Sequence, residues 1–211
     1  MKKIFTYILV VTSLLSLFSC IQREDVSIED VKVDMVFSAT VSDGHMTKTV
    51  IDGELGDSYR NTLWLPEDSI AIMGQNRAYV YKFVNIRTEA DEVGIFDGSS
   101  SQNSVYYALY PYSADARNTN NVFRVYIPSQ QKYTPGSFAS GAAPMVAKTA
   151  NGEEGMLSFK NLCGVLVLKL TGEECISSIT FSSKDEAGNW NKISDEWMVD
   201  MNYDSIPELV T

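Results

Sequence analysis

Residues 31–40 read VKVDMVFSAT, and apolar side chains stand at every second position of this stretch. The alternating apolar residues are Val31, Val33, Met35, Phe37 and Ala39. Polar residues occupy the positions between them, with Val36 as the exception. A period of two indicates a β-strand with one buried face. This stretch therefore predicts a strand whose apolar row belongs to a core.

Similar short segments follow along the chain, separated by turn signals such as those at residues 74–76, 97–101 and 118–121. They predict strands at residues 69–73, 78–84, 104–110, 121–127 and 144–147, and a hairpin of 165–170 with 176–181. No segment before residue 183 has a helical period. Many short strands at roughly 8–12-residue spacing are typical of an antiparallel β-sandwich or barrel.

The N-terminus has the pattern of an export signal. Lys2 and Lys3 precede an almost unbroken apolar run at residues 4–18, which ends at Ser19 and Cys20. Such a run is a secretory signal, and it is short for a membrane span, which needs about 20 apolar residues. We expect residues 1–19 to be a lipoprotein signal peptide, with Cys20 lipidated. An ordinary signal peptide or an uncleaved anchor is the alternative.

The acidic stretch at residues 20–32 predicts a flexible linker between the lipid anchor and the domain. An acidic stretch directly after a lipidated cysteine resembles the surface-export signal of Bacteroidota lipoproteins. That resemblance implies a protein anchored to the cell outer membrane and exposed at the surface, and a plain solvated linker is the alternative. The formal net charge of −10 disfavours nucleic acid as a partner, because phosphate binding needs clustered Lys and Arg.

Residues for catalysis are scarce. His45 is the single histidine of the chain and falls in a predicted loop. No nucleophile elbow, phosphate loop or dinucleotide fingerprint occurs, and no His/Cys pair has zinc spacing. We therefore expect no enzyme activity, no metal and no cofactor. Cys163 and Cys175 flank the predicted hairpin, whose register holds them too far apart for a disulfide, so two buried or half-buried free thiols are expected.

Several segments in a fixed order resemble the fimbrillin-like family of Bacteroidota, the subunits and relatives of their surface pili. The matching segments are residues 37–40, 47–49, 64–70, 79–83, 94–98, 106–112, 127–131, 144–147 and 159–166. The resemblance implies a transthyretin-like β-sandwich over residues 33–183, exported as a lipidated precursor. Residues 184–211 would then be a loop and the start of a truncated second β domain.

In such pilus subunits a protease removes the first strand, and a donor strand from another subunit replaces it by β-strand addition. The resemblance therefore assigns Val31, Val33, Met35 and Phe37 to the replaceable strand and names other pilus subunits as partners. Lys48 stands where the family's processing site falls, although the protease prefers arginine, and Arg60 lies later in the chain. An uncut protein would be an anchor, a terminal subunit or a relative outside the pilus.

Two further possibilities concern sugars. The triplets at residues 68–70 and 204–206 both read Asp-Ser-Ile and resemble O-glycosylation sites of exported Bacteroides proteins, which points to Ser69 and Ser205. A rival function is a surface glycan-binding lipoprotein of a polysaccharide-uptake system. It would stack sugar rings on Trp64 and on the aromatic residues of 106–112. Buried rings would favour the pilus subunit, and exposed coplanar rings would favour the glycan binder, while a host ligand is possible for either.

Overall fold

Strands and connecting loops make up the part of the chain that the computed structural model describes. That part comprises residues 31–41, 50–51, 62–75, 79–116, 118–134, 138–139, 141–149, 155–164, 166, 168–202 and 208–210. Among these residues no helix is long and apolar enough to cross a membrane. The all-β class predicted from the alternating segments is confirmed.

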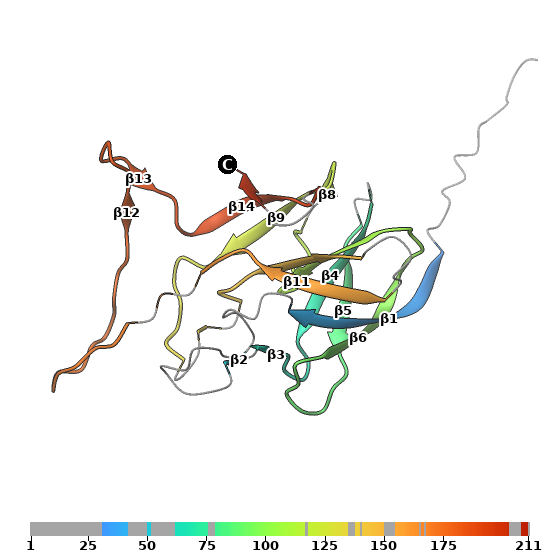
Figure 1. Ribbon diagram of the computed structural model, residues 1–211, viewed down its shortest axis with the longest axis horizontal. Helices are drawn as coiled ribbons and strands as arrows, with labels where there is room; N and C mark the ends of the chain where they lie inside the picture. The colour runs from blue at the N-terminus through green and yellow to red at the C-terminus, as the bar shows by residue number, and fades with distance from the viewer. Residues whose placement is uncertain are drawn as a thin grey trace, which may run out of the picture. The chain divides into compact units, whose positions relative to one another are not determined.

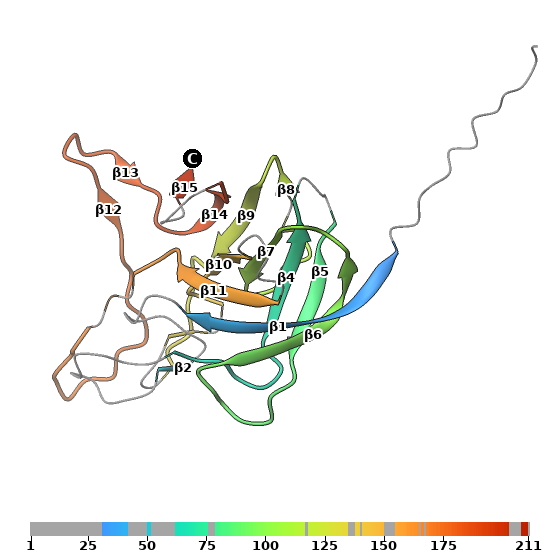
Figure 2. The ribbon, with the colours of Figure 1, turned by 45° about the vertical axis from the view of Figure 1, so that its right-hand side comes forward.

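Seven strands form a closed barrel in the order β1, β11, β10, β7, β4, β5, β6 (Figure 1). Their bounds are β1 Lys32–Val41, β4 Ser69–Gly74, β5 Tyr81–Asn85, β6 Gly94–Ser101, β7 Tyr106–Tyr110, β10 Met145–Lys148 and β11 Met156–Asn161. β1 closes the barrel because it pairs antiparallel with β6 on one side and parallel with β11 on the other. Figure 2 shows these three strands side by side.

The predicted antiparallel β-sandwich is therefore wrong, because the sheet is mixed and closes on itself. Alternation along a strand reports that one face is buried, and it reports nothing of which strands become neighbours. The parallel pair of Ser38–Val41 with Met156–Phe159 decides the closure. These two segments are more than a hundred residues apart in the sequence.

A second, four-stranded sheet has the order β15, β14, β9, β8. Its strands are β8 Asn118–Thr119, β9 Val122–Ile127, β14 Asp195–Asp200 and β15 Glu208–Val210. β14, which was predicted to begin a second domain, pairs antiparallel with β9 over its whole length. Two short pairs complete the described strands: β2 Val50–Ile51 with β3 Thr62–Leu63, and β12 Ser183–Lys184 with β13 Trp190–Asn191.

Two core clusters lie on opposite faces of β4 and β7. Tyr106, Ala108 and Tyr110 belong to the first cluster, with the barrel strands, whereas Tyr107 and Leu109 belong to the second. The second cluster also contains residues of β9 and β14, including Phe123, Val125 and Val199. β7 is consequently buried at all five positions. Successive side chains of β7 therefore alternate between the two clusters, as expected for a strand covered on both faces.

Two predictions of secondary structure are wrong, one for a turn in the barrel and one for a hairpin after β11. Residues 97–101, predicted as a turn, form the second half of β6 and pair with Lys32–Val36 of β1. The predicted hairpin does not form: of residues 165–170 and 176–181, those that the structure describes are exposed and unassigned to any strand. A lone hairpin is marginally stable without a layer to cover it, and the described part of the chain supplies none here.

Candidate functional site

The first strand enters the core only along its second half. Phe37 and Ala39 are fully buried, and Met35 packs partly against the same cluster. The ring of Phe37 makes edge contacts with Phe83 and Tyr106, at centroid distances of 5.2 and 5.3 Å. Aromatic pairs of this geometry stabilise a core beyond their buried area. Phe37 is thus a central contact between β1 and the rest of the barrel.

The first half of β1 differs from the prediction. Val31 and Val33 were expected to face the core, but they are 77% and 37% exposed. The reason is the register, because β11 pairs with β1 only from Ser38 onward. Before that point β1 is held by β6 alone among the described strands. Here Ser99 Oγ donates to Asp34 Oδ1 at 2.7 Å, a polar contact in place of core packing.

The aromatic residues proposed as a sugar platform are mostly buried. Trp64 has no exposed surface, and its ring lies edge-on against Phe96, Tyr110 and Phe159 at 5.1–5.4 Å. Tyr106, Tyr107 and Tyr110 are 2–4% exposed. Burial and the adjacent Asp68 carboxylate raise the pKa of Tyr110 well above its ordinary value. These rings cannot stack on a sugar, so a platform of Trp64 and residues 106–110 is excluded.

A segment outside the described strands exposes several large apolar side chains. The described residues of the segment 166–181, which leave out residue 167, include six large apolar side chains that are each 43–69% exposed: Leu166, Leu168, Leu170, Ile176, Ile179 and Phe181. Soluble proteins that function alone rarely leave so many large apolar side chains together in water. The sequence identified these residues as strands but not as an exposed surface, because alternation does not say whether a covering layer exists.

The two thiols are free, as predicted. Cys163 is half-buried, and burial raises the pKa of its thiol. Cys175 is exposed, contrary to the expectation that both would be at least partly buried. It lies within the exposed segment, where nothing in the described part of the chain covers it.

The remaining predicted site residues divide into two groups. Cys20, Lys48, Arg60 and Ser205 lie outside the described residues, as do His45 and the signal peptide. Ser69 is the half-buried first residue of β4, and its carbonyl oxygen accepts the Tyr112 N–H at 2.8 Å. In front of it, Asp68 Oδ2 accepts the Leu65 N–H at 2.6 Å. The Asp-Ser-Ile triplet therefore starts a strand, and its glycosylation stays a prediction.

No three His, Cys, Asp or Glu side chains gather closely enough to hold a metal ion within the residues that the structure describes. Comparisons with protein-family models, curated proteins and solved structures gave no match. The likeness to fimbrillins thus rests on the ordered sequence segments, and function has to be argued from the geometry of this chain.

Proposed function

We propose that this chain is a structural or adhesive surface lipoprotein, a fimbrillin-like pilus subunit or pilus-associated protein that assembles by β-strand addition. The observation that carries the proposal is the exposed segment 166–181. Its sequence suits strands, and its apolar side chains lie in water.

A strand from another subunit would supply what this segment lacks. In β-strand addition the backbone groups of an incoming strand complete the hydrogen bonding, and its side chains cover alternate positions. Leu166, Leu168 and Leu170 stand at such alternate positions. Pairing would bury their exposed area, and burial of apolar surface contributes about 25 cal/mol per Å².

The pairing of β1 is a second observation that supports the same proposal. It is held by backbone pairing with β6 and β11, and it buries Phe37 and Ala39 between them. Loss of this strand would leave two free sheet edges and a strip of uncovered core. Unpaired edges recruit other strands, so an incoming strand that mimics Met35, Phe37 and Ala39 could close the barrel again.

The test is to recover the full-length protein from cells, measure its intact mass and N-terminal sequence, and run it without boiling in SDS. We expect a start at lipidated Cys20 or, after processing, just past the first strand, near Thr49. We also expect SDS-resistant ladders. A protein that stays monomeric after cross-linking on intact cells would contradict the proposal.

A pair of matched variants localises the contact. Ile176 lies in the exposed segment and Ile86 outside it, and both are 58% exposed. Ile176→Asp should abolish the ladders because a carboxylate cannot be buried under an added strand without a large desolvation cost. Ile86→Asp should leave the ladders intact. Equal ladders in both variants would exclude this segment as the assembly surface.

A further inference from the structure

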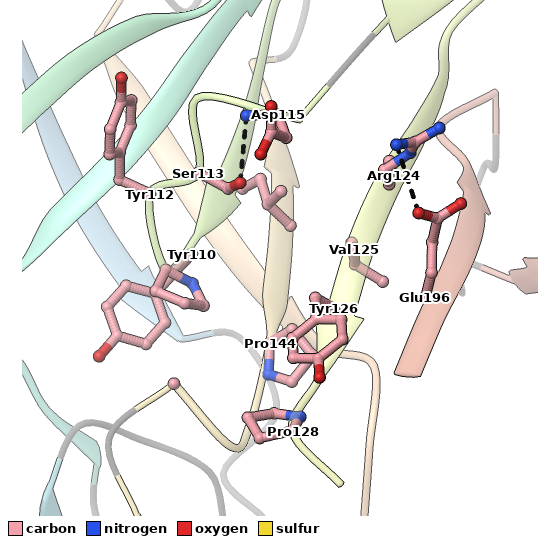
Figure 3. A pocket seen from close by; sticks show the side chains of 13 residues that line it. Tyr110, Tyr112, Ser113, Asp115, Arg124, Val125, Tyr126, Pro128, Pro144 and Glu196 are labelled. Carbon is pink, nitrogen blue, oxygen red and sulfur yellow. Dashed lines mark hydrogen bonds and ion pairs between the residues drawn. The ribbon is translucent and has the colours of Figure 1, made fainter. Parts of the chain in front are cut away.

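A hollow of about 440 Å³ opens beside the second sheet, between residues 109–115 and the strands β9 and β14. Its volume falls in the range of roughly 300–1,000 Å³ typical of small-molecule sites. Figure 3 shows Tyr110 and Tyr112 on one side and Tyr126 with Pro128 and Pro144 on the other. This hollow is distinct from the exposed segment 166–181, which contributes no residue to it.

One wall is apolar and carries an aromatic ring that the fold does not use. Tyr126 is a β9 residue with 57% of its surface exposed, although its neighbours Val125 and Ile127 are buried. Pro128 and Pro144 line the hollow together with it (Figure 3). A tyrosine in this position offers a flat apolar face and a hydroxyl that remains in water.

The other walls bring charged groups of both signs to the hollow. Arg124 Nη1 and Glu196 Oε2 are 3.3 Å apart, and Asp115 lines the same space. The Nε of Arg124 is buried and has no hydrogen-bond acceptor among the described residues. A buried N–H without an acceptor is unfavourable, and it leaves the hydrogen-bonding capacity of this side chain incompletely used. A ligand can meet the accessible parts of Arg124 and Glu196, whose side chains are 41% and 51% exposed.

We propose that this hollow binds a sugar ring of a neutral carbohydrate. The ring's C–H face would lie on Tyr126, and its hydroxyl groups would meet Arg124, Glu196 and Asp115. These side chains provide both donors and acceptors, as a polyhydroxylated ligand requires. Two carboxylates against one guanidinium disfavour an anionic ligand. The inference is independent of strand addition, and it uses an aromatic residue outside the buried platform.

The probes are the methyl glycosides of glucose, galactose, mannose and N-acetylglucosamine, measured by saturation-transfer NMR and by titration of backbone amide shifts in the full-length protein. At least one glycoside should bind saturably and shift the amides of residues 110, 112–115 and 124–127. Absence of saturable binding by all four, up to millimolar protein and high glycoside concentration, would overturn the proposal.

Matched variants separate this site from nonspecific contact. Tyr126→Ala should weaken binding roughly tenfold through loss of the ring face, whereas Tyr79→Ala, which removes a ring of similar exposure elsewhere, should not. Arg124→Gln should also weaken binding, while Arg87→Gln, from an ion pair of similar exposure, should not. Equal binding by the members of either pair would overturn the assignment.

A proline-rich peptide is the competing occupant, because such peptides dock on aromatic-lined grooves. A decaproline peptide serves as the probe for it. Binding of decaproline that Tyr126→Ala abolishes, with no glycoside bound, would overturn the carbohydrate proposal. If neither the glycosides nor decaproline binds, the expectation of SDS-resistant ladders is unchanged. The two proposals are therefore tested separately.

Discussion

The second half of β1 and the segment 166–181 both have sequences that suit β-strands, and their surroundings are opposite. In β1, Phe37 and Ala39 are fully buried between β6 and β11. In the other segment, Leu168 and Phe181 remain about half exposed, with no strand assigned to them. A strand-like sequence shows that a segment is suited to burial. Its apolar side chains are buried only where a neighbouring strand or layer covers them. The predictions below test how far the two regions differ.

The largest effect is expected at Phe37. Phe37→Asp places a charge in the core and removes two aromatic contacts, so it should lower the free energy of unfolding by at least about 3 kcal/mol. Urea unfolding followed by circular dichroism measures the loss. Val36→Asp is the control on the opposite face of the strand, where Val36 is 54% exposed, and it should cost less than about 1 kcal/mol. A wild-type midpoint for Phe37→Asp would remove β1 from the core.

A glycine next to each region gives the next comparison, since Gly98 of β6 pairs with Met35 of β1 and Gly164 precedes the segment 166–181. A Cβ at Gly98 of β6 would lie 2.8 Å from Phe83 Cγ and 2.9 Å from the Lys82 carbonyl oxygen. Gly98→Ala should therefore cost about 1–3 kcal/mol. Gly164, just before the exposed segment, has nothing within 4 Å of such a Cβ. Gly164→Ala should be neutral or stabilise by up to about 1 kcal/mol. Equal thermal midpoints for the two variants would contradict the packing described around β6.

The reactivity of the two thiols compares a half-buried position, Cys163, with an exposed one in the segment 166–181, Cys175. Burial raises the pKa of Cys163, which lowers its thiolate fraction at neutral pH, and the thiolate is the reactive form. Cys175 is exposed. Iodoacetamide should therefore modify Cys175 well before Cys163, and alkylation of Cys163 should accelerate only at more alkaline pH. Peptide mapping by mass spectrometry reports each site separately. Faster labelling of Cys163 would show that its surroundings open readily.

The smallest effect is expected in the exposed segment of the isolated monomer. Phe181→Ser removes a large ring that is half exposed, and its effect on the free energy of unfolding should stay within about 0.5 kcal/mol. Urea titration at low protein concentration is the measurement. A loss as large as that of Phe37→Asp would mean that the segment is already covered in the monomer.

Much of the fold was predictable wherever apolar residues cluster between turn signals. The strands at residues 69–73, 121–127 and 144–147 agree with β4, β9 and β10 to within one residue at each end. β6 was missed, because Asp97 to Ser101 has the composition of a turn. Its Ser100 and Ser101 are nevertheless buried, and Ser101 Oγ accepts the Tyr81 hydroxyl at 3.2 Å. Long-range pairing with β1 overrode the local preference of these residues.

The candidate sites were less predictable than the strands. The sequence pointed to the aromatic residues of 106–112, but these residues serve the two cores, and even the half-buried Tyr112 packs against the second. No sequence motif pointed to Tyr126, Arg124 or Glu196. These residues lie on two strands that meet only through the pairing of β9 with β14. A hollow formed by residues about 70 positions apart cannot be found by spacing.

The sequence by itself determined the β class and the position of the first strand. These features depend on local alternation. The thiols are free as expected, but the hairpin register from which this was predicted does not occur. Only the tertiary structure decided that the sheet closes, that Val31 and Val33 lie outside the core and that residues 166–181 remain uncovered. Each of these depends on which strands become neighbours, and that choice is made by contacts between segments far apart in the chain.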